Sequence, residues 1–161
     1  MPREIERKFL LKSDAWRALA HRRQPMRQGY IAGSNRTSVR VRIAGDDAWL
    51  NIKSRRLGAS RLEYEYAIPV HEARELLALA VGPLIDKTRH FVEHGGMTWE
   101  VDEFHGENEG LVVAELELDS EGQEFPPPSW IGIEVTELSR YYNACLVKHP
   151  YSAWTDAERN P

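Results

Sequence analysis

The stretch Glu4-Ile5-Glu6-Arg7-Lys8, near the start of the chain, contains the pattern that decides the fold. Alternation with a period of two residues is typical of a β-strand, and it places Glu4, Glu6 and Lys8 on one face. Two like charges about 4 Å apart cost on the order of 4 kcal/mol at an effective dielectric near 20, so the two carboxylates repel each other. A divalent metal ion would relieve this repulsion, whereas a solvated edge strand is the simpler interpretation of this segment alone.

The same parity of polar, mostly charged side chains recurs in strand after strand. It is found at Arg40 and Arg42, at Asn51 and Lys53, at Arg61, Glu63 and Glu65, at Lys87 and Arg89, at Glu100 and Asp102, and at Glu115 and Glu117. Each strand alone fits an open sheet with one solvated face, but such faces usually also contain Thr, Ser, Gln and Asn. The collective pattern favours a closed barrel with an ionic interior.

Turn and helix signals complete the predicted architecture. Residues 44–47 (Ala-Gly-Asp-Asp) predict a hairpin turn between strands over 38–43 and 48–53. Amphipathic patterns predict helices over 13–20, with Ser13 as the N-cap, over 71–81 and over 139–149. The sequence therefore predicts a single α+β domain over residues 1–161, with helices packed outside the barrel.

Composition excludes several classes of protein. The chain has 161 residues, with 21 Lys and Arg against 25 Asp and Glu, so no basic excess exists to hold a long nucleic acid. We expect no membrane span and no signal peptide, because no apolar run is long enough. The single cysteine, Cys145, excludes an internal disulfide and is expected to be a buried thiol. Together these features predict a cytoplasmic protein.

Common phosphate and metal motifs are absent from the sequence. It contains no glycine-rich phosphate loop, no dinucleotide fingerprint and no zinc spacing of Cys and His. His90 and His94 are predicted to be surface histidines. A bound phosphate would therefore have to be held by side chains rather than by a backbone nest.

With these residues in place, the chain resembles the CYTH-domain proteins of the triphosphate tunnel metalloenzyme superfamily. Residues 4–8 match the Glu-x-Glu-x-Lys signature, and the charged pairs given above follow in the family's order. They end with Glu134-Val135-Thr136 before a tyrosine-bearing helix. The resemblance spans nearly the whole chain and implies an eight-stranded antiparallel closed β-barrel, a tunnel that binds polyphosphate with a divalent metal.

The resemblance also implies roles for individual residues. Mg²⁺ or Mn²⁺ would be held by Glu4, Glu6, Glu115 and Glu117, with Glu63 as a further candidate. The phosphate chain would be bound by Lys8, Arg40, Arg42, Lys53, Arg61, Lys87 and Arg89. Supporting roles fall to Glu65, Glu100 and Asp102. Two candidates stay open for the general base, a tunnel carboxylate or a pair of Lys8 with Tyr30, and Tyr30 could equally be a structural aromatic residue.

The implied activity is metal-dependent hydrolysis of inorganic tripolyphosphate, or a related short triphosphate, to pyrophosphate and phosphate. The same scaffold also serves adenylate cyclases and thiamine triphosphatases. A non-catalytic binder of polyphosphate or nucleotide is the alternative from a different class, although it would need the basic residues far more than the carboxylates. The expected partner is a small-molecule triphosphate. A homodimer also stays open, because apolar positions could form an interface or underlie helices.

Overall fold

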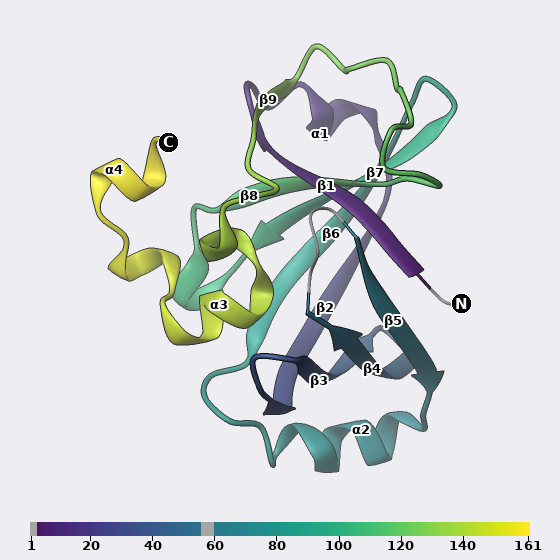
Figure 1. Cartoon of the computed structure of the whole chain (residues 1–161), viewed down its shortest axis with the longest axis vertical. Helices are drawn as coiled ribbons and strands as arrows, with labels where there is room; N and C mark the ends of the chain where they lie inside the picture. Colours follow the sequence, from purple (N-terminus) through teal and green to yellow (C-terminus); the bar gives the residue numbers. More distant parts are fainter. Residues whose placement is uncertain (1–2, 56–59) are drawn as a thin grey trace.

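The computed structural model describes residues 3–55 and 60–161. Its strands are β1 (Arg3–Leu11), β2 (Ala20–Gly33), β3 (Thr37–Ala44), β4 (Asp47–Ser54), β5 (Ser60–Ala67), β6 (Ile85–His94), β7 (Met97–Phe104), β8 (Val112–Glu117) and β9 (Ile131–Glu134). The order in the sheet is β5-β4-β3-β2-β6-β7-β8-β1-β9, and a further pairing of β5 with β1 closes it. The predicted eight-stranded closed antiparallel barrel is confirmed, and β9 is a short ninth strand beside β1 (Figure 1).

Strand β1 closes the barrel because different parts of it pair with different neighbours. Its first residues, Arg3–Ile5, pair with β5, and residues 6–9 pair with β8. Farther along, Phe9 and Leu11 pair with β9. Glu4, Glu6 and Lys8 are thereby held at the seam, where the two ends of the sheet meet.

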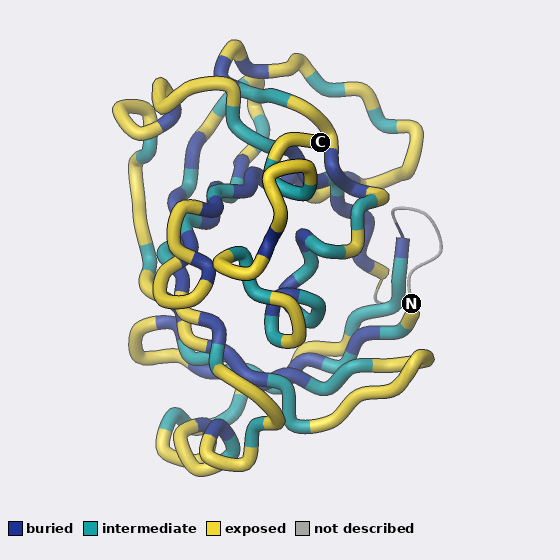
Figure 2. The backbone as a smooth tube through the Cα atoms, turned by 90° about the vertical axis from the view of Figure 1, so that its left-hand side faces the viewer, coloured by how far each residue is buried: buried dark blue, intermediate teal, exposed yellow. Residues whose placement is uncertain are grey.

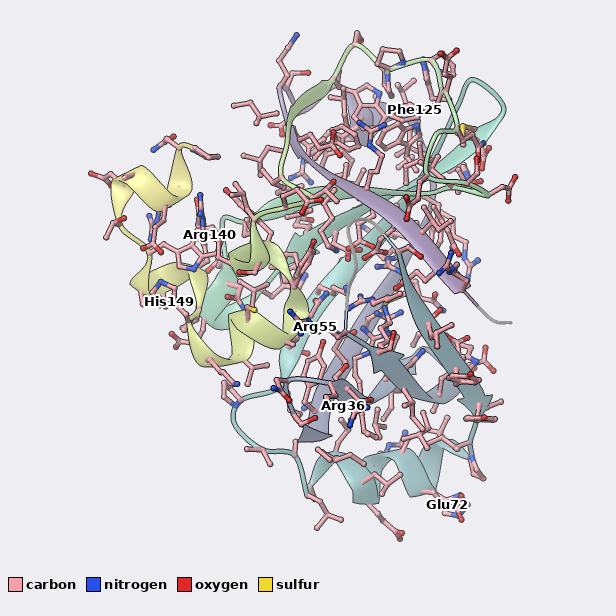
Figure 3. All side chains as sticks on the ribbon, in the orientation of Figure 1. Arg36, Arg55, Glu72, Phe125, Arg140 and His149 are labelled. Atoms are coloured by element: carbon pink, nitrogen blue, oxygen red, sulfur yellow. The ribbon has the colours of Figure 1, made fainter. Side chains whose placement is uncertain are left out.

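Apolar side chains on the outer faces of the strands build the core. One cluster lies on β1, β6, β7 and β8, where Trp99 packs edge-to-face against Phe9, Phe125 and Trp130. Helix α1 (Trp16–Leu19) and the connection before β9, with Phe125, cover this cluster (Figure 3). A second cluster lies under α2 (Val70–Leu77), against β2, β3 and β4. Figure 2 shows the buried stretches along the barrel strands and the exposed connections around them.

The C-terminal region covers one end of the barrel instead of its side. It consists of the 3₁₀-helix η2 (Ser139–Tyr141), α3 (Asn143–Lys148), η3 (Tyr151–Ala153) and α4 (Asp156–Arg159). A third apolar cluster joins Tyr141, Leu146 and Trp154 to Ile85 and Val113 of the barrel. The remaining 3₁₀-helix, η1 (Gly106–Asn108), precedes β8.

The predicted helix boundaries were wrong at several places. Ser13 is not an N-cap: its hydroxyl accepts from the N–H of Ala15, and α1 begins only at Trp16. The helix predicted over 71–81 spans Val70–Leu77, because the N–H of Val81 donates to β2 instead. The helix predicted over 139–149 is interrupted at Tyr142, whose backbone is extended.

The structure also tests the predictions for the 44–47 turn, His90 and Cys145. The hairpin at 44–47 is confirmed, with Gly45 at φ +62° as its turn residue. His90 is not on the surface: it is buried, with its ring 4.9 Å from that of Trp16. Cys145 is half-buried and not fully enclosed. No helix in the described ranges is both long and apolar enough to cross a membrane.

Candidate active site

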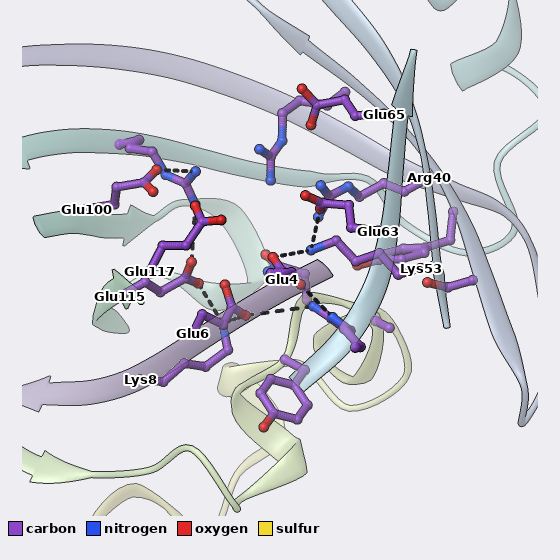
Figure 4. Close-up of a pocket in the computed structure, with 18 residues that line it drawn as sticks. Glu4, Glu6, Lys8, Arg40, Lys53, Glu63, Glu65, Glu100, Glu115 and Glu117 are labelled. Carbon is purple, nitrogen blue, oxygen red and sulfur yellow. Dashed lines mark hydrogen bonds and ion pairs between the residues drawn. The ribbon is translucent and has the colours of Figure 1, made fainter. Parts of the chain in front are cut away.

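A cavity of about 150 Å³ lies inside the barrel, and charged side chains line it (Figure 4). Every residue that the sequence predicted for the site lines it, except Lys87 and Asp102. The lining residues are Glu4, Glu6, Lys8, Tyr30, Ser38, Arg40, Arg42, Lys53, Arg61, Glu63, Glu65, Arg89, Glu100, Glu115, Glu117, Tyr142, Asn143 and Ala144. The period-two pattern thus does bring ionic side chains from many strands together.

The register of the strands explains which charges meet. Across β1 and β8, Lys8 lies opposite Glu115, and Glu6 lies opposite Glu117. Directly opposed residues of neighbouring strands are within side-chain contact, so opposite charges attract and like charges repel. The first pair is therefore an ion pair, while the second sets two carboxylates side by side.

Glu4 is neutralised by two cations from the other side of the seam. Lys53 donates to its Oε1 at 2.9 Å and Arg61 donates to its Oε2 at 2.7 Å. Burial alone would raise the pKa of Glu4, but Lys53 and Arg61 outweigh it and lower that pKa to about 2. Glu4 is thus ionised at neutral pH.

Lys8 is held charged by carboxylates. Its Nζ donates to Glu115 Oε1 at 2.5 Å and lies 3.4 Å from Glu6 Oε1. Burial lowers the pKa of Lys8, yet the two carboxylates more than offset this and raise it. Within the described residues, no hydrogen bond or ion pair joins Lys8 to Tyr30. Both residues line the cavity, and a catalytic pair of Lys8 with Tyr30 stays a prediction.

Glu117 has no cationic partner in the described part of the chain. Burial, together with Glu4, Glu100, Glu63 and Glu6, raises the pKa of Glu117 to about 7. Among the described lining residues, Glu117 is therefore a carboxylate whose ionised form would be stabilised by a bound cation.

Two arginines of β3 form the opposite wall. Arg42 donates to Gln28, and the buried Nε of Arg40 has no hydrogen-bond partner among the described residues. Burial, with the neighbouring Arg40 and Arg89, lowers the pKa of Arg42, but a guanidinium stays protonated in proteins. Among the described residues, neither arginine is ion-paired with a carboxylate, and Glu117 is not ion-paired with a cation.

Lys87 and Asp102 lie behind the cavity instead of on its surface. Lys87 is fully buried: its Nζ donates to Asp102 at 2.6 Å and lies 3.4 Å from Asn143 Oδ1. Arg89 also donates to Asp102, through Nε and Nη2 at 2.8 and 2.9 Å. Burial would raise the pKa of Asp102, but Arg89 and Lys87 lower it to about 2. Asp102 therefore holds Arg89 in place, while the Nη1 of Arg89 reaches Glu100.

Four lining residues were not predicted from the sequence. Ser38 shares the parity of Arg40 and Arg42 on β3, so that pattern could have found it. The other three lie at the start of α3: Tyr142, Asn143 and Ala144. The alternation of residues along a strand cannot predict that residues outside the strands line the cavity. The Nζ of Lys8 lies 5.2 Å from the centre of the Tyr142 ring, so α3 forms part of the cavity wall.

Comparison with known proteins decides the family. The chain matches the model of the CYTH domain over residues 2–148. It belongs to the CYTH domain family.

Individual relatives of this CYTH-domain chain are similar over most of their length. An inorganic triphosphatase of Acetivibrio thermocellus is 52% identical over 152 residues, covering 94% of this chain and 97% of that protein. An inorganic triphosphatase of Nitrosomonas europaea is 37% identical over 147 residues, covering 89% of this chain and 95% of that protein. A crystal structure of an inorganic triphosphatase has a TM-score of 0.65 and 34% identity, with 89% of this chain and 93% of that one covered.

The charged cavity of this CYTH domain suits a divalent metal ion that is coordinated partly by protein carboxylates and partly by substrate phosphates. Among the described residues, no group of three His, Cys, Asp or Glu is arranged to hold a metal alone. The lining nevertheless offers hard carboxylate oxygens, and Glu117 has no ion-paired cation among the residues that the structure describes. Mg²⁺ is usually bound by one or two carboxylates together with waters and substrate phosphates. The residues present suit that mode.

Charge balance points the same way. Seven carboxylates and six basic side chains line the cavity, so the lining has a formal charge of −1. A polyphosphate entering alone would increase the negative charge in a confined space, where charges interact strongly. A divalent cation that entered with the anion would offset part of this negative charge, and Glu117 is a carboxylate that could bind it.

Proposed function

We propose that this CYTH-domain protein is a divalent-metal-dependent triphosphatase that hydrolyses inorganic tripolyphosphate, or a related short triphosphate, to pyrophosphate and phosphate. The observation that carries the proposal is the charged cavity inside the barrel. Among the described residues, its Arg40 and Arg42 have no ion-paired carboxylate and its Glu117 has no ion-paired cation. The names of two relatives with high coverage support it.

The basic wall would bind and orient the phosphate chain. Guanidinium groups match pairs of phosphate oxygens, and lysines act as point charges. Arg40 and Arg42 are available at once, because no carboxylate of the described residues is ion-paired with them. Arg89 is held by Asp102 and is therefore fixed in its direction before substrate arrives.

Hydrolysis then requires a water to form a bond to the terminal phosphorus while the bond to the bridging oxygen breaks. When bound at Glu117 with Glu4, Glu6 and Glu115, and with Glu63 as a further candidate ligand, Mg²⁺ or Mn²⁺ would offset the charge on the phosphoryl oxygens. Lys8, kept protonated by Glu115 and Glu6, stabilises the leaving pyrophosphate. Because Lys8 is charged, we assign the proton of the water to a cavity carboxylate.

Phosphate release tests the proposal. After treatment with chelator, the protein should release phosphate from tripolyphosphate only when Mg²⁺ or Mn²⁺ is added back. Glu117→Gln and Arg40→Ala should each abolish the release, whereas Glu75→Gln, at an exposed position of α2, should not alter it. Tight binding of tripolyphosphate in chelator without turnover in any metal would instead identify a non-catalytic binder. Formation of a cyclic nucleotide without phosphate release would identify a cyclase.

We also propose that residues 1–161 act as one domain and that the protein works in the cytoplasm. A homodimer stays a prediction. Sedimentation velocity tests it directly, since a single boundary at the monomer mass would reject it.

A further inference from the structure

Gln28 of β2 is a fully buried amide that contacts one of the lining arginines. It is 0% exposed, and it is not among the described residues that line the charged cavity. In the pairing of β2 with β3 it lies directly opposite Arg42, and its Oε1 accepts a hydrogen bond from Arg42 Nε at 2.9 Å. Gln28 therefore holds a side chain of the cavity wall from a position outside the lining.

The chemistry of this pair fixes which way the amide points. A guanidinium group only donates hydrogen bonds, so the amide oxygen must face Arg42 and the NH₂ group must point elsewhere. In the part of the chain that the structure describes, the Nε2 atom of Gln28 is buried and has no hydrogen-bond partner. A buried donor without a partner destabilises a fold. Stability alone therefore does not explain an amide at this position.

The charge around Arg42 makes a neutral partner unexpected. Burial, with the neighbouring Arg40 and Arg89, lowers the pKa of Arg42, so its positive charge is disfavoured where it lies. A carboxylate beside Arg42 would stabilise this charge, as Asp102 does for Arg89 through hydrogen bonds of 2.8 and 2.9 Å. The two arginines are thus held in different ways, Arg89 by an anion and Arg42 by a neutral oxygen.

A neutral acceptor fixes the direction of a guanidinium group without cancelling its charge. The guanidinium has five N–H donors, so the bond from Nε leaves four donors on the Nη atoms of Arg42. None of these four is hydrogen-bonded to another residue that the structure describes. A carboxylate at position 28 would compete with phosphate oxygens for the same cation, because both form strong charge-assisted hydrogen bonds with arginine. The amide of Gln28 does not compete in this way.

We propose that Gln28 is a positioning residue for anion binding, whose amide orients Arg42 while leaving the positive charge of Arg42 available to the phosphate chain. This inference rests on the proposed triphosphatase function for the identity of the anion. It adds a residue from outside the cavity lining to the groups that determine phosphate affinity.

Two substitutions of similar size separate direction from charge. Gln28→Glu keeps the acceptor and adds a negative charge, whereas Gln28→Met removes the acceptor and leaves Arg42 charged. In titration calorimetry with pyrophosphate and Mg²⁺, we expect Gln28→Glu to raise Kd about tenfold or more, because its carboxylate pairs with Arg42. Gln28→Met should raise Kd only about threefold, because Arg42 keeps its charge but must be ordered on binding.

A control variant excludes an effect of net charge. Asn35→Asp adds one negative charge at an exposed position of the turn between β2 and β3. It should change Kd for pyrophosphate by about twofold at most, because exposed charges are screened by salt. A weakening by Asn35→Asp as large as that by Gln28→Glu would overturn the inference.

Thermal stability separates a positioning residue from a merely structural one. Without added anion, Gln28→Glu should melt at or above the temperature of the wild type, because its carboxylate stabilises the charge of Arg42. Gln28→Met should melt close to the wild type, since it removes a buried NH₂ group that has no partner in the described ranges. Weaker binding without lower stability is therefore the expected result. Binding that weakens only in variants that have lost stability would overturn the inference.

Initial rates with tripolyphosphate give a second readout. Gln28→Glu should raise KM by about the same factor as Kd and change kcat by about twofold at most, the pattern of a lost interaction that substrate and transition state share. A lower kcat with unchanged Kd and KM would overturn the assignment of Gln28 to anion binding.

The remaining outcomes separate this inference from the proposed function. If the wild type hydrolyses tripolyphosphate and Gln28→Glu binds pyrophosphate equally well, the inference fails and the triphosphatase stands. It also fails if Gln28→Met binds more weakly than Gln28→Glu, because direction and not charge would then be decisive. If Gln28→Glu weakens binding in a protein that releases no phosphate with any metal, the inference stands and the proposed function fails. If the wild type does not bind pyrophosphate at all, the inference fails.

Discussion

Glu117 shows how the surroundings of one residue can make stability depend on pH. Its pKa of about 7 lies above the ordinary value of 4.5, so the folded protein holds a proton there that the unfolded chain has lost. The free energy of unfolding must therefore fall as pH rises from about 4.5 through 7. At neutral pH, a bound cation would reverse this loss.

We accordingly expect Glu117→Gln, in chelator, to be increasingly more thermostable than the wild type as pH rises from 5 to 8. Added Mg²⁺ should raise the melting temperature of the wild type and have little effect on the variant. Thermal scans across pH with and without metal measure both effects. Equal melting curves for wild type and variant at pH 8 would contradict the charge assignment of Glu117.

Lys87 and Asp102 allow a test of a fully buried ion pair. Breaking such a pair by removing one partner costs about 3–5 kcal/mol, because the other charge is left unpaired. Lys87→Met should lower the free energy of unfolding by about this much, although Arg89 still pairs with Asp102 and moderates the loss. The exposed Lys12→Met serves as the matched control in urea titrations.

The double variant Lys87→Met/Asp102→Asn makes this test sharper. If the two charges compensate each other, its loss of stability should be smaller than the sum of the single losses. Strict additivity would show that Lys87 is not coupled to Asp102.

At the scale of elements, α3 decides the shape of one end of the barrel. Its Val147 packs against Gly82, whose positive φ and missing Cβ both permit the contact. Gly82→Ala should therefore cost about 1–3 kcal/mol, the range for a residue forced into a sparsely populated backbone region. Amide hydrogen exchange should show the loss in α3, with Gly122→Ala, which has open space around it, as the control. Unchanged protection of α3 would show that this contact does not hold the helix.

At the scale of the whole molecule, mixed charges inside a barrel make stability depend on acidity. The lowered pKa values of Glu4 and Asp102, both about 2, mean that the folded state holds these carboxylates ionised below their ordinary range. Their contribution is present above about pH 4.5 and is lost as pH falls toward 2. We expect the melting temperature to drop steeply over that interval, and Glu4→Gln to flatten the drop. A profile without any drop between pH 5 and 2 would contradict the ion pairing.

Much of this arrangement could be predicted because a strand's parity is local. The face shared by Glu4, Glu6 and Lys8 is fixed by three neighbouring residues, and so is that of Arg40 and Arg42. The alternation of residues shows which face of a strand a side chain lies on, but it does not show where along the barrel that side chain lies. Lys87 has the correct parity but lies where Asn143 of α3 and Phe104 cover it, so it supports Arg89 instead of lining the cavity.

The contribution of α3 depended on tertiary structure. Whether residues 139–149 form one helix depends on Tyr142, whose hydroxyl donates to the carbonyl of Thr136 while its backbone is extended. That bond exists only once the chain has folded back over the barrel. The burial of His90 under Trp16 likewise depends on where α1 packs, and its strand alone does not reveal it.

The central claim is that a polyphosphate and a divalent cation bind together inside this barrel. A crystal structure of the Lys8→Ala variant with tripolyphosphate and Mn²⁺ tests it most directly, because the anomalous signal of manganese locates the cation independently. We expect manganese beside Glu117 and phosphate oxygens on Arg40 and Arg42. Manganese or the anion bound only on the outer surface, with the cavity holding water alone, would contradict the account.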